Sequence, residues 1–299
     1  MVAQAKRAWY LNLDAEEELR LPGAINPSRA VVERCARLAS SLAGLVPDGD
    51  LVWTPGADAP KAHGRRAMAW CPTPSALKVL SRAGAVVAEA PSREALRAAN
   101  HRSLSAAVAQ CLPGAAYVTD EGALEALLAT RSLTGVWLLK RPLGYRGGGK
   151  LRVRGDSLDE AARRWVRASL AREGGVQVEP EVERVEDHGQ HGFLARDGAV
   201  TWGALTRQRL DAFGQWVATE RMAEDALNDL ENRALREVCA GVVEALRAVG
   251  YYGPFGVDAF RWRSPAGELR YCALCEVNAR YSMGWAVGMA GRRVDLDPE

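Results

Sequence analysis

The sequence predicts a chain of mixed class, with an α/β module first and two α+β lobes after it. Three observations carry this prediction. Strand-like and helical segments alternate over about the first hundred residues. A glycine-rich loop then lies between two strand-like segments, and a long helical stretch is later followed by a strand hairpin. With 299 residues, 48% of them hydrophobic, the chain can bury a core divided over two or three subdomains.

In the first module, apolar runs predict strands at residues 7–13, 50–56, 67–72 and 85–90. Amphipathic runs predict helices at residues 28–45, 75–84 and 92–112. Such alternation is typical of a parallel sheet with helices on its faces. The pattern G-x-G-x-x-G does not follow the first strand, so the sequence gives little support for a dinucleotide site there.

Beyond residue 114 the pattern changes to strands with few helices between them. We expect strands at residues 115–120, 135–143, 150–155, 175–183, 192–198 and 199–210. A helix is expected over 157–174, where Ser157 and Glu160 fit a capping box. A longer helix is expected over 223–250, and residues 255–263 and 268–278 then form a hairpin.

Composition excludes several classes of protein. The formal net charge is only +2, whereas a general nucleic-acid surface is usually strongly basic. No apolar run approaches the roughly 18 residues that a membrane-spanning helix needs. The first residues lack the apolar stretch of a signal peptide. These features predict a cytoplasmic protein with neither nucleic-acid nor membrane partners.

Two short patterns suggest metal or redox sites. Cys272 and Cys275 form a C-x-x-C pattern inside an expected strand, where positions three apart point to opposite faces. His188 and His191 lie in a polar stretch without nearby cysteine partners. We interpret the two cysteines as structural and the two histidines as part of a solvated loop.

The most informative segment is the glycine loop. The strand before it ends near Lys140, and the loop contains Gly144, Gly147, Gly148 and Gly149. With the following lysine it also fits the P-loop pattern G-x-x-x-x-G-K, but a P-loop needs Ser or Thr next and then a helix. Leucine and a strand follow instead. We therefore predict a flap that covers phosphates, with Lys140 as a phosphate-binding charge; the alternative is an ordinary hairpin turn.

Two later groups of residues also suggest ligand binding. Around Glu179, extended backbone could hydrogen-bond adenine, Val182 could pack on the ring and Glu186 could accept both ribose hydroxyls. An exposed acidic strand is the alternative interpretation of this segment.

The second group consists of Asp258, Glu276 and Asn278. Residues i and i+2 of a strand share a face, so Glu276 and Asn278 present two oxygens side by side. If Asp258 lies on the neighbouring strand, all three supply the hard oxygen ligands that Mg²⁺ prefers. The alternative is a solvent-facing polar pair.

Taken in this order, these residues resemble the ATP-grasp superfamily over roughly residues 85–291. The resemblance implies a preATP-grasp domain over 1–98, a central lobe with the glycine flap over 99–175, and a C-terminal lobe with the metal site over 176–299. It places Glu179 at the adenine hinge and Glu186 at the ribose. The seven-residue step between these glutamates matches D-alanine–D-alanine ligases.

The resemblance extends to three further arginines, and the chain departs from the family at one place. Arg280 corresponds to the arginine of the family's Glu-x-Asn-x-Arg pattern, which reaches the substrate or its acyl phosphate. Arg207 and Arg209 are phosphate contacts on the same analogy, or else surface charges. The chain departs from the family where an Asp-Lys pair usually supplies a second phosphate-binding lysine, because His101 stands at that position with Arg102 beside it. Arginine could supply the charge, whereas histidine could do so only when protonated.

The resemblance implies an ATP-dependent ligase that joins a carboxylate to an amine. ATP and Mg²⁺, or Mn²⁺ in its place, would be the cofactors. The carboxylate would attack the γ-phosphate to give an acyl phosphate, the amine would capture it, and ADP and phosphate would be released. The family also suggests a homodimer. Two alternatives are an ATP-grasp phosphotransferase and a non-catalytic regulatory protein that binds nucleotide.

Overall fold

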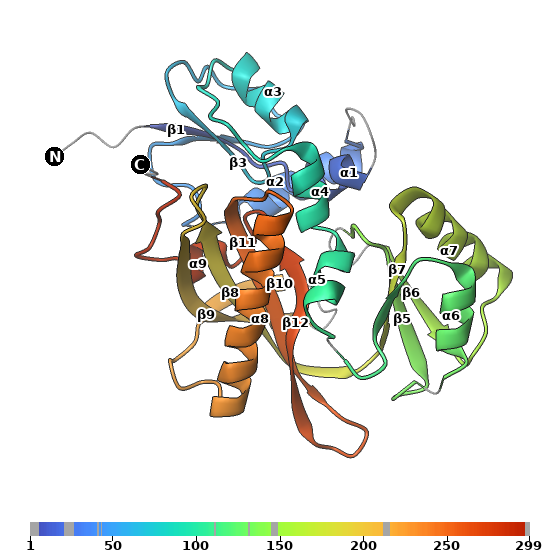
Figure 1. Cartoon of the computed structure of the whole chain (residues 1–299). Helices are drawn as coiled ribbons and strands as arrows, with labels where there is room; N and C mark the ends of the chain where they lie inside the picture. Colours follow the sequence, from blue (N-terminus) through green and yellow to red (C-terminus); the bar gives the residue numbers. More distant parts are fainter. Residues whose placement is uncertain are drawn as a thin grey trace.

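The computed structural model describes residues 6–20, 27–40, 42, 44–110, 112–130, 132–144, 149–211 and 216–296 (Figure 1). Within these residues, twelve strands form three sheets of three, four and five strands. No helix in this described part of the chain has the length and apolar character to cross a membrane. The mixed α/β class predicted from the sequence is confirmed.

The first module contains a parallel sheet in the order β2-β1-β3, as predicted. Its strands are β1 (Arg7–Tyr10), β2 (Leu51–Trp53) and β3 (Arg66–Ala69). The helices of this module are α1 (Ala15–Arg20), α2 (Arg29–Ala39) and α3 (Pro74–Arg82). The strand expected at 85–90 is reduced to a single bridge at Val86. Val86 is mostly exposed, so pairing there would bury little apolar surface.

The single helix expected over 92–112 is two helices, α4 (Arg93–Ala99) and α5 (Arg102–Val108). At the break, the Asn100 side chain donates to the Ala279 carbonyl at 3.2 Å and accepts from the Ala279 N–H at 2.9 Å. His101 follows in an extended conformation and caps α5. Because Ala279 follows the last strand of the chain, this pairing places the start of α5 beside the C-terminal sheet.

The central sheet is antiparallel in the order β4-β7-β5-β6. Its strands are β4 (Ala116–Val118), β5 (Val136–Lys140), β6 (Lys150–Arg154) and β7 (Val176–Pro180). A separate apolar core joins the sheet to α6 (Glu121–Leu128) and α7 (Glu160–Glu173), which lie together at the right of Figure 1. Because β7 pairs within this sheet, the change to the next sheet comes after Pro180, whereas the sequence boundary was placed at 175.

The capping box expected at Ser157 is wrong. Helix α7 begins later, and its N-cap is Asp159, whose carboxylate accepts from the Ala162 N–H at 2.7 Å. A carboxylate at this position also interacts favourably with the positive end of the helix dipole. The other end agrees with the prediction, because Gly174 adopts φ 83° and ends the helix in the left-handed conformation.

The third sheet is antiparallel in the order β10-β9-β8-β11-β12. Its strands are β8 (Glu183–Leu194), β9 (Val200–Leu210), β10 (Trp216–Arg221), β11 (Gly253–Arg263) and β12 (Leu269–Asn278). Helix α8 (Asp229–Ala248) packs on it, and the short helix α9 (Trp285–Gly288) follows β12. One hydrophobic core joins this sheet to the first module, with Trp9, Leu96, Leu246, Val257 and Trp285 among its members.

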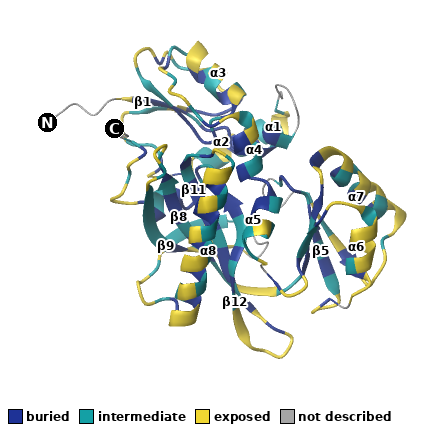
Figure 2. Ribbon diagram, viewed as in Figure 1, coloured by how far each residue is buried: buried dark blue, intermediate teal, exposed yellow. Residues whose placement is uncertain are grey.

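The solvated loop expected around His188 and His191 is wrong. Both residues lie inside β8, the central strand of the sheet, and both are almost fully buried; Figure 2 shows the sheet around β8 and β11 mostly as buried or intermediate. Gly189 and Gly192 leave room for side chains packed beside this strand, because a Cβ would lie 3.0 Å from the His191 ring at Gly189 and 2.7 Å from the Phe255 ring at Gly192. The His191 ring contacts Thr206 Oγ1 at 3.1 Å and Ser282 Oγ at 3.3 Å, so its polar atoms are satisfied inside the core.

Burial of His191 predicts a loss of stability in acid. Burial lowers the pKa of this histidine from 6.5 to about 4. Between those values the unfolded chain binds a proton that the folded chain does not. The contribution of neutral His191 to the free energy of unfolding is therefore complete above pH 6.5, and roughly 3 kcal/mol should be lost as the pH falls from 6.5 to 4. Denaturant unfolding at pH 7 and pH 4 should show this loss in the wild type and a smaller one in His191→Gln; equal losses would exclude His191 as the group.

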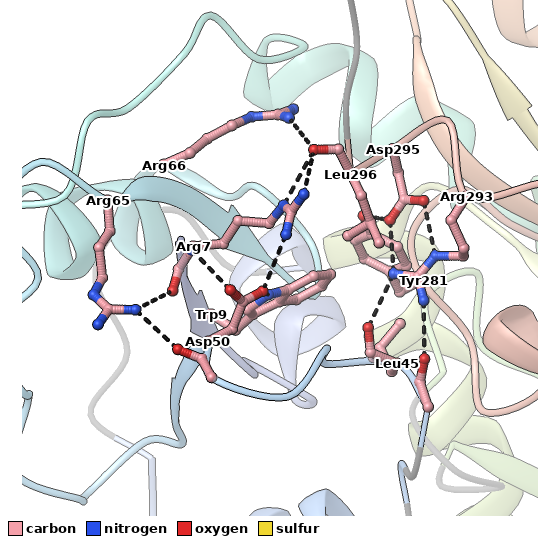
Figure 3. Close-up of polar contacts among 12 residues, drawn as sticks. Arg7, Trp9, Leu45, Asp50, Arg65, Arg66, Tyr281, Arg293, Asp295 and Leu296 are labelled. Carbon is pink, nitrogen blue, oxygen red and sulfur yellow. Dashed lines mark hydrogen bonds and ion pairs between the residues drawn. The ribbon is translucent and has the colours of Figure 1, made fainter. Parts of the chain in front are cut away.

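The segment after β12 is tied to the first module (Figure 3). The Arg7 guanidinium donates to the Leu296 carbonyl at 2.8 Å. The Tyr281 hydroxyl donates to Asp295 at 2.8 Å, and both side chains are buried. Tyr281 directly follows Arg280, and its N–H donates to the Trp70 carbonyl at 3.1 Å, so the backbone that carries this arginine is held against the first module.

Candidate active site

A cavity of about 1090 Å³ opens between the central sheet and the five-stranded sheet. It is slightly larger than the roughly 300–1,000 Å³ that ligand pockets usually measure. Its lining includes these residues assigned to nucleotide or phosphate binding from the sequence: Lys140, Glu179, Val182, Glu186, Arg207 and Arg209. The assigned metal ligands lie beside it, because Gln208 in the lining donates to Asp258 at 3.4 Å.

Lys140 is the last residue of β5, and its side chain is almost fully buried. Its ammonium forms an ion pair with the carboxylate of Glu179 on the neighbouring strand β7, which is buried as well. A buried charge requires such a partner, because desolvation of an isolated ion is costly. The structure thus joins the assigned phosphate-binding lysine to the assigned adenine-hinge glutamate in one wall of the cavity.

The glycine loop connects two antiparallel strands, as predicted, and no helix follows it. Lys140 on β5 is the register partner of Lys150 on β6. Gly149 has φ 75°, and a Cβ there would lie 3.2 Å from the Arg141 side chain, so both backbone conformation and space favour glycine. Gly144, in the first part of the loop, is described, whereas the assigned Gly147 and Gly148 lie outside the described residues.

Lys150 also belongs to the cavity wall, although the sequence interpretation gave it no role. Partial desolvation lowers the pKa of its ammonium, and the neighbouring charges of Lys140 and Arg102 lower it further. Lys140 and Arg102 therefore lie close enough to Lys150 to affect its pKa, and this group of cations at the base of the glycine loop suits an anionic ligand.

The three assigned metal ligands converge as the strand period predicts. Asp258 on β11 is the register partner of Glu276 on β12, and Gly256 is the partner of Asn278. The Asn278 amide donates to Asp258 Oδ2 at 2.9 Å. Two carboxylates and an amide oxygen thus come from adjacent strands, which fits the oxygen ligands of Mg²⁺. Among the described residues, no group of three or more His, Cys, Asp or Glu side chains could hold a metal ion, so the amide would have to complete the set.

The electrostatics of this set also fit a cation. Desolvation, and then the charge of Glu276, raise the pKa of Asp258 to about 7. Burial alone would raise the pKa of Glu276 as well, but Arg102, Lys140 and Arg280 lower it. Two adjacent carboxylates with opposite pKa shifts form a site in which a divalent cation would remove the repulsion.

The structure separates the roles of His101 and Arg102. The His101 ring lies 3.0 Å from the Glu173 carbonyl and 2.7 Å from Ser103 Oγ, and burial lowers its pKa, so it is neutral near pH 7. Arg102 is buried too, and its guanidinium pairs with Glu276 at 3.0 Å. Arg102, not His101, thus brings a permanent positive charge to the assigned metal ligands.

Glu186, assigned to the ribose, lines the cavity near the start of β8. Its carboxylate accepts from His188 Nε2 at 2.7 Å and from the guanidinium groups of Arg207 and Arg261 at 2.9 and 3.0 Å. Desolvation alone would raise the pKa of Glu186, but these three contacts outweigh it and the pKa is lowered. The carboxylate is ionised and able to accept further hydrogen bonds.

Arg207 and Arg209 both point along one side of β9 towards Glu220 on β10. Arg209 pairs with Glu220 at 2.9 Å, and both arginines are exposed. Exposed pairs of this kind contribute little to stability. Both arginines line the cavity, so the geometry leaves them free to turn towards a ligand without disturbing the core.

Arg280 contacts Glu16, a residue to which the sequence interpretation assigned no role. Its guanidinium forms an ion pair with Glu16, which lies in α1 of the first module and is buried. The second oxygen of Glu16 is buried without a hydrogen-bond partner. Only an acidic residue in a short helix marked this position in the sequence, so no local pattern could have found a contact across 264 residues.

The C-x-x-C pattern does not form a two-cysteine site. Cys275 is a free thiol, and burial raises its pKa. Cys272 is buried and disulfide-bonded, and its partner cannot be Cys275. The two sulfurs therefore do not form a disulfide with each other, in agreement with the structural interpretation of this pair.

No protein-family model and no curated protein matches the sequence. Solved structures match the fold over nearly the whole chain. The D-Ala:D-Ser ligase VanG from Enterococcus faecalis matches with a TM-score of 0.52 and 11% identity, over 96% of this chain and 96% of that one. D-alanyl-alanine synthetase A from Vibrio cholerae matches with a TM-score of 0.51 and 12% identity, over 93% of this chain and 90% of that one.

A third match is the biotin carboxylase domain of 2-oxoglutarate carboxylase from Hydrogenobacter thermophilus, in complex with MgADP and bicarbonate. Its TM-score is 0.50 and its identity 13%, over 94% of this chain and 65% of that one. At these identities the likeness establishes the fold and leaves the activity to be argued from the site.

Proposed function

Because the chain has the ATP-grasp fold, we propose that it is an ATP- and Mg²⁺-dependent ligase that joins a carboxylate to an amine through an acyl phosphate. The observation that supports this most is the convergence of Asp258, Glu276 and Asn278 on adjacent strands, beside a cavity lined by Lys140. A protein that had lost catalysis would have no need to keep two costly neighbouring carboxylates there.

In this proposal the nucleotide lies in the cavity between the two sheets. Extended backbone around Glu179 would bind the adenine, with Val182 packed on the ring, and Glu186 would accept from the ribose. Lys140 and Arg102 would neutralise the phosphates, and the glycine loop would close over them and exclude water. Asp258, Glu276 and Asn278 would hold Mg²⁺, which neutralises charge on the terminal phosphates when it is bound.

The acceptor end of the site lies at Arg280. A substrate carboxylate would attack the γ-phosphate in line, and Arg280 would stabilise the negative charge of the acyl phosphate. The amine would then attack the acyl carbon and expel phosphate, giving an amide. Glu16 holds Arg280 from the first module, so this module contributes directly to the acceptor end.

Calorimetry and a turnover screen test the proposal. The purified protein should bind ATP with Mg²⁺ and should release ADP only when a suitable carboxylate and amine are both present. A panel of amino acids and small carboxylates, tested singly and in pairs, would reveal the pair. Failure to bind nucleotide, with Lys140→Ala and Glu276→Ala indistinguishable from the wild type, would exclude the proposed function.

Substitutions at the neighbouring residues His101 and Arg102 should have unequal effects. Arg102→Met removes a buried charge that we place at the phosphates, and should weaken MgATP binding by about tenfold or more. Arg102→Lys keeps the charge and should retain more of the affinity. His101→Gln should leave the affinity nearly unchanged, because His101 is neutral. A larger loss for His101→Gln than for Arg102→Met, measured by calorimetry on folded variants, would reverse the assignment.

A further inference from the structure

Three side chains hold the carboxylate of Glu186 in place. One oxygen, Oε2, accepts from His188 Nε2 at 2.7 Å and from Arg261 Nη1 at 3.0 Å. The other oxygen, Oε1, accepts from Arg207 Nη1 at 2.9 Å. A carboxylate oxygen has about two acceptor sites, so Oε2 is saturated and Oε1 retains capacity.

The two donors on Oε2 are fixed by the core. His188 is fully buried, and the ring nitrogen that faces Glu186 must carry the proton because a carboxylate only accepts. Arg261 is largely buried and makes two further hydrogen bonds to Glu231, at 2.8 and 2.6 Å, and one to the Ala226 carbonyl at 2.8 Å. A planar guanidinium with this many partners has no freedom to turn.

Glu231 in turn belongs to the start of α8. It is the third residue of that helix, and its carboxylate accepts from the Asn228 N–H at 3.0 Å in a capping box. The chain of contacts therefore runs from the helix cap through Arg261 to Glu186 at the cavity wall. In contrast, Arg207 on Oε1 is about half exposed and also pairs with the exposed Glu220, at 3.6 Å, so a ligand can displace it.

We propose that Arg261, anchored by Glu231 and assisted by His188, is a positioning residue that orients Glu186 so that its free oxygen recognises a ribose hydroxyl. The protein then selects ribonucleotides over nucleotides whose sugar lacks hydroxyls. This inference rests on the proposed function, because it takes the cavity to be the nucleotide site. In this arrangement Arg261 itself does not contact the nucleotide.

Binding of ATP and of 2′,3′-dideoxy-ATP, each with Mg²⁺, tests the inference by calorimetry without any need for turnover. The wild type should prefer ATP by about tenfold or more, the equivalent of one charge-assisted hydrogen bond. Arg261→Met should reduce this preference to less than about threefold by weakening ATP binding, while the affinity for the dideoxy nucleotide stays the same. A general loss of structure would weaken both nucleotides equally.

Two further variants distinguish a loss of positioning from a folding defect. Arg261→Lys keeps a positive charge between the two glutamates but cannot bridge them in one plane, so it should fold and still lose most of the preference. Arg263→Met makes the same kind of change two residues along β11, where the arginine is exposed and pairs with Glu183, and should keep the wild-type preference.

The possible outcomes are separable. A wild type that binds both nucleotides equally, or an Arg261→Lys variant that keeps the full preference, would overturn the inference while leaving nucleotide binding intact. A wild type that binds neither nucleotide would overturn the proposed function and this inference with it.

Discussion

Replacing Glu276 with glutamine is expected to lower the rate of ADP release by about two to three orders of magnitude. The change removes one of the two carboxylates that would hold Mg²⁺, and charge stabilisation by a metal contributes several kcal/mol to a phosphoryl-transfer transition state. Glutamine keeps the size of the side chain and an oxygen that can still accept from the buried Arg102, so the hairpin of β11 and β12 should stay folded with some loss of stability. The measurement is steady-state ADP release with the substrate pair found in the screen.

Glu268→Gln is the matched control for this experiment. Glu268 lies just before β12, at the turn of the same hairpin, is exposed and forms its one ion pair among the described residues with Arg270 at 2.7 Å, so its loss should change neither activity nor stability measurably. A second measurement separates metal binding from other effects. The Mg²⁺ concentration needed for half-maximal nucleotide binding should rise for Glu276→Gln alone. An unchanged Mg²⁺ requirement together with full activity would remove Glu276 from the metal set.

The convergence of the assigned metal ligands followed from the sequence because it depends only on local rules. The period of a strand places Glu276 and Asn278 on one face, and a short turn between two strands makes them neighbours in a sheet. Asp258 therefore had to lie near them once the hairpin was recognised, and the register of β11 and β12 bears this out. The two strands around the glycine loop followed from the same reasoning.

Contacts between distant segments could not be predicted in this way. The pairing of Glu16 with Arg280 joins residues 264 positions apart, and no spacing rule relates them. The different roles of His101 and Arg102 depend on a helix break at Asn100, which is stabilised by Ala279 on another element. His188 and His191 look solvated in sequence, but β8 is the central strand of its sheet and both side chains are buried there. In each case tertiary packing determines the environment of the residue and overrides what its local sequence suggests.

Substitutions of Lys140 and Lys150 should distinguish the flap interpretation of the glycine loop from a P-loop. Lys140→Ala is expected to abolish measurable ATP binding and to destabilise the fold by about 3–5 kcal/mol, because it leaves the buried Glu179 carboxylate without its partner. Lys150→Ala is expected to weaken ATP binding by less than about tenfold, because Lys150 is exposed and forms no ion pair with another residue in the described part of the chain. Calorimetry and thermal unfolding measure the two effects.

A double variant separates nucleotide binding from folding. Lys140→Met combined with Glu179→Gln removes both buried charges together, and replacing a whole buried pair costs much less than breaking it. We therefore expect the double variant to recover most of the lost stability and still fail to bind ATP. Recovery of binding in the double variant would show that Lys140 acts only through stability. Loss of binding in Lys150→Ala with full binding in Lys140→Ala would return the phosphate-binding role to the lysine after the glycines, as in a P-loop.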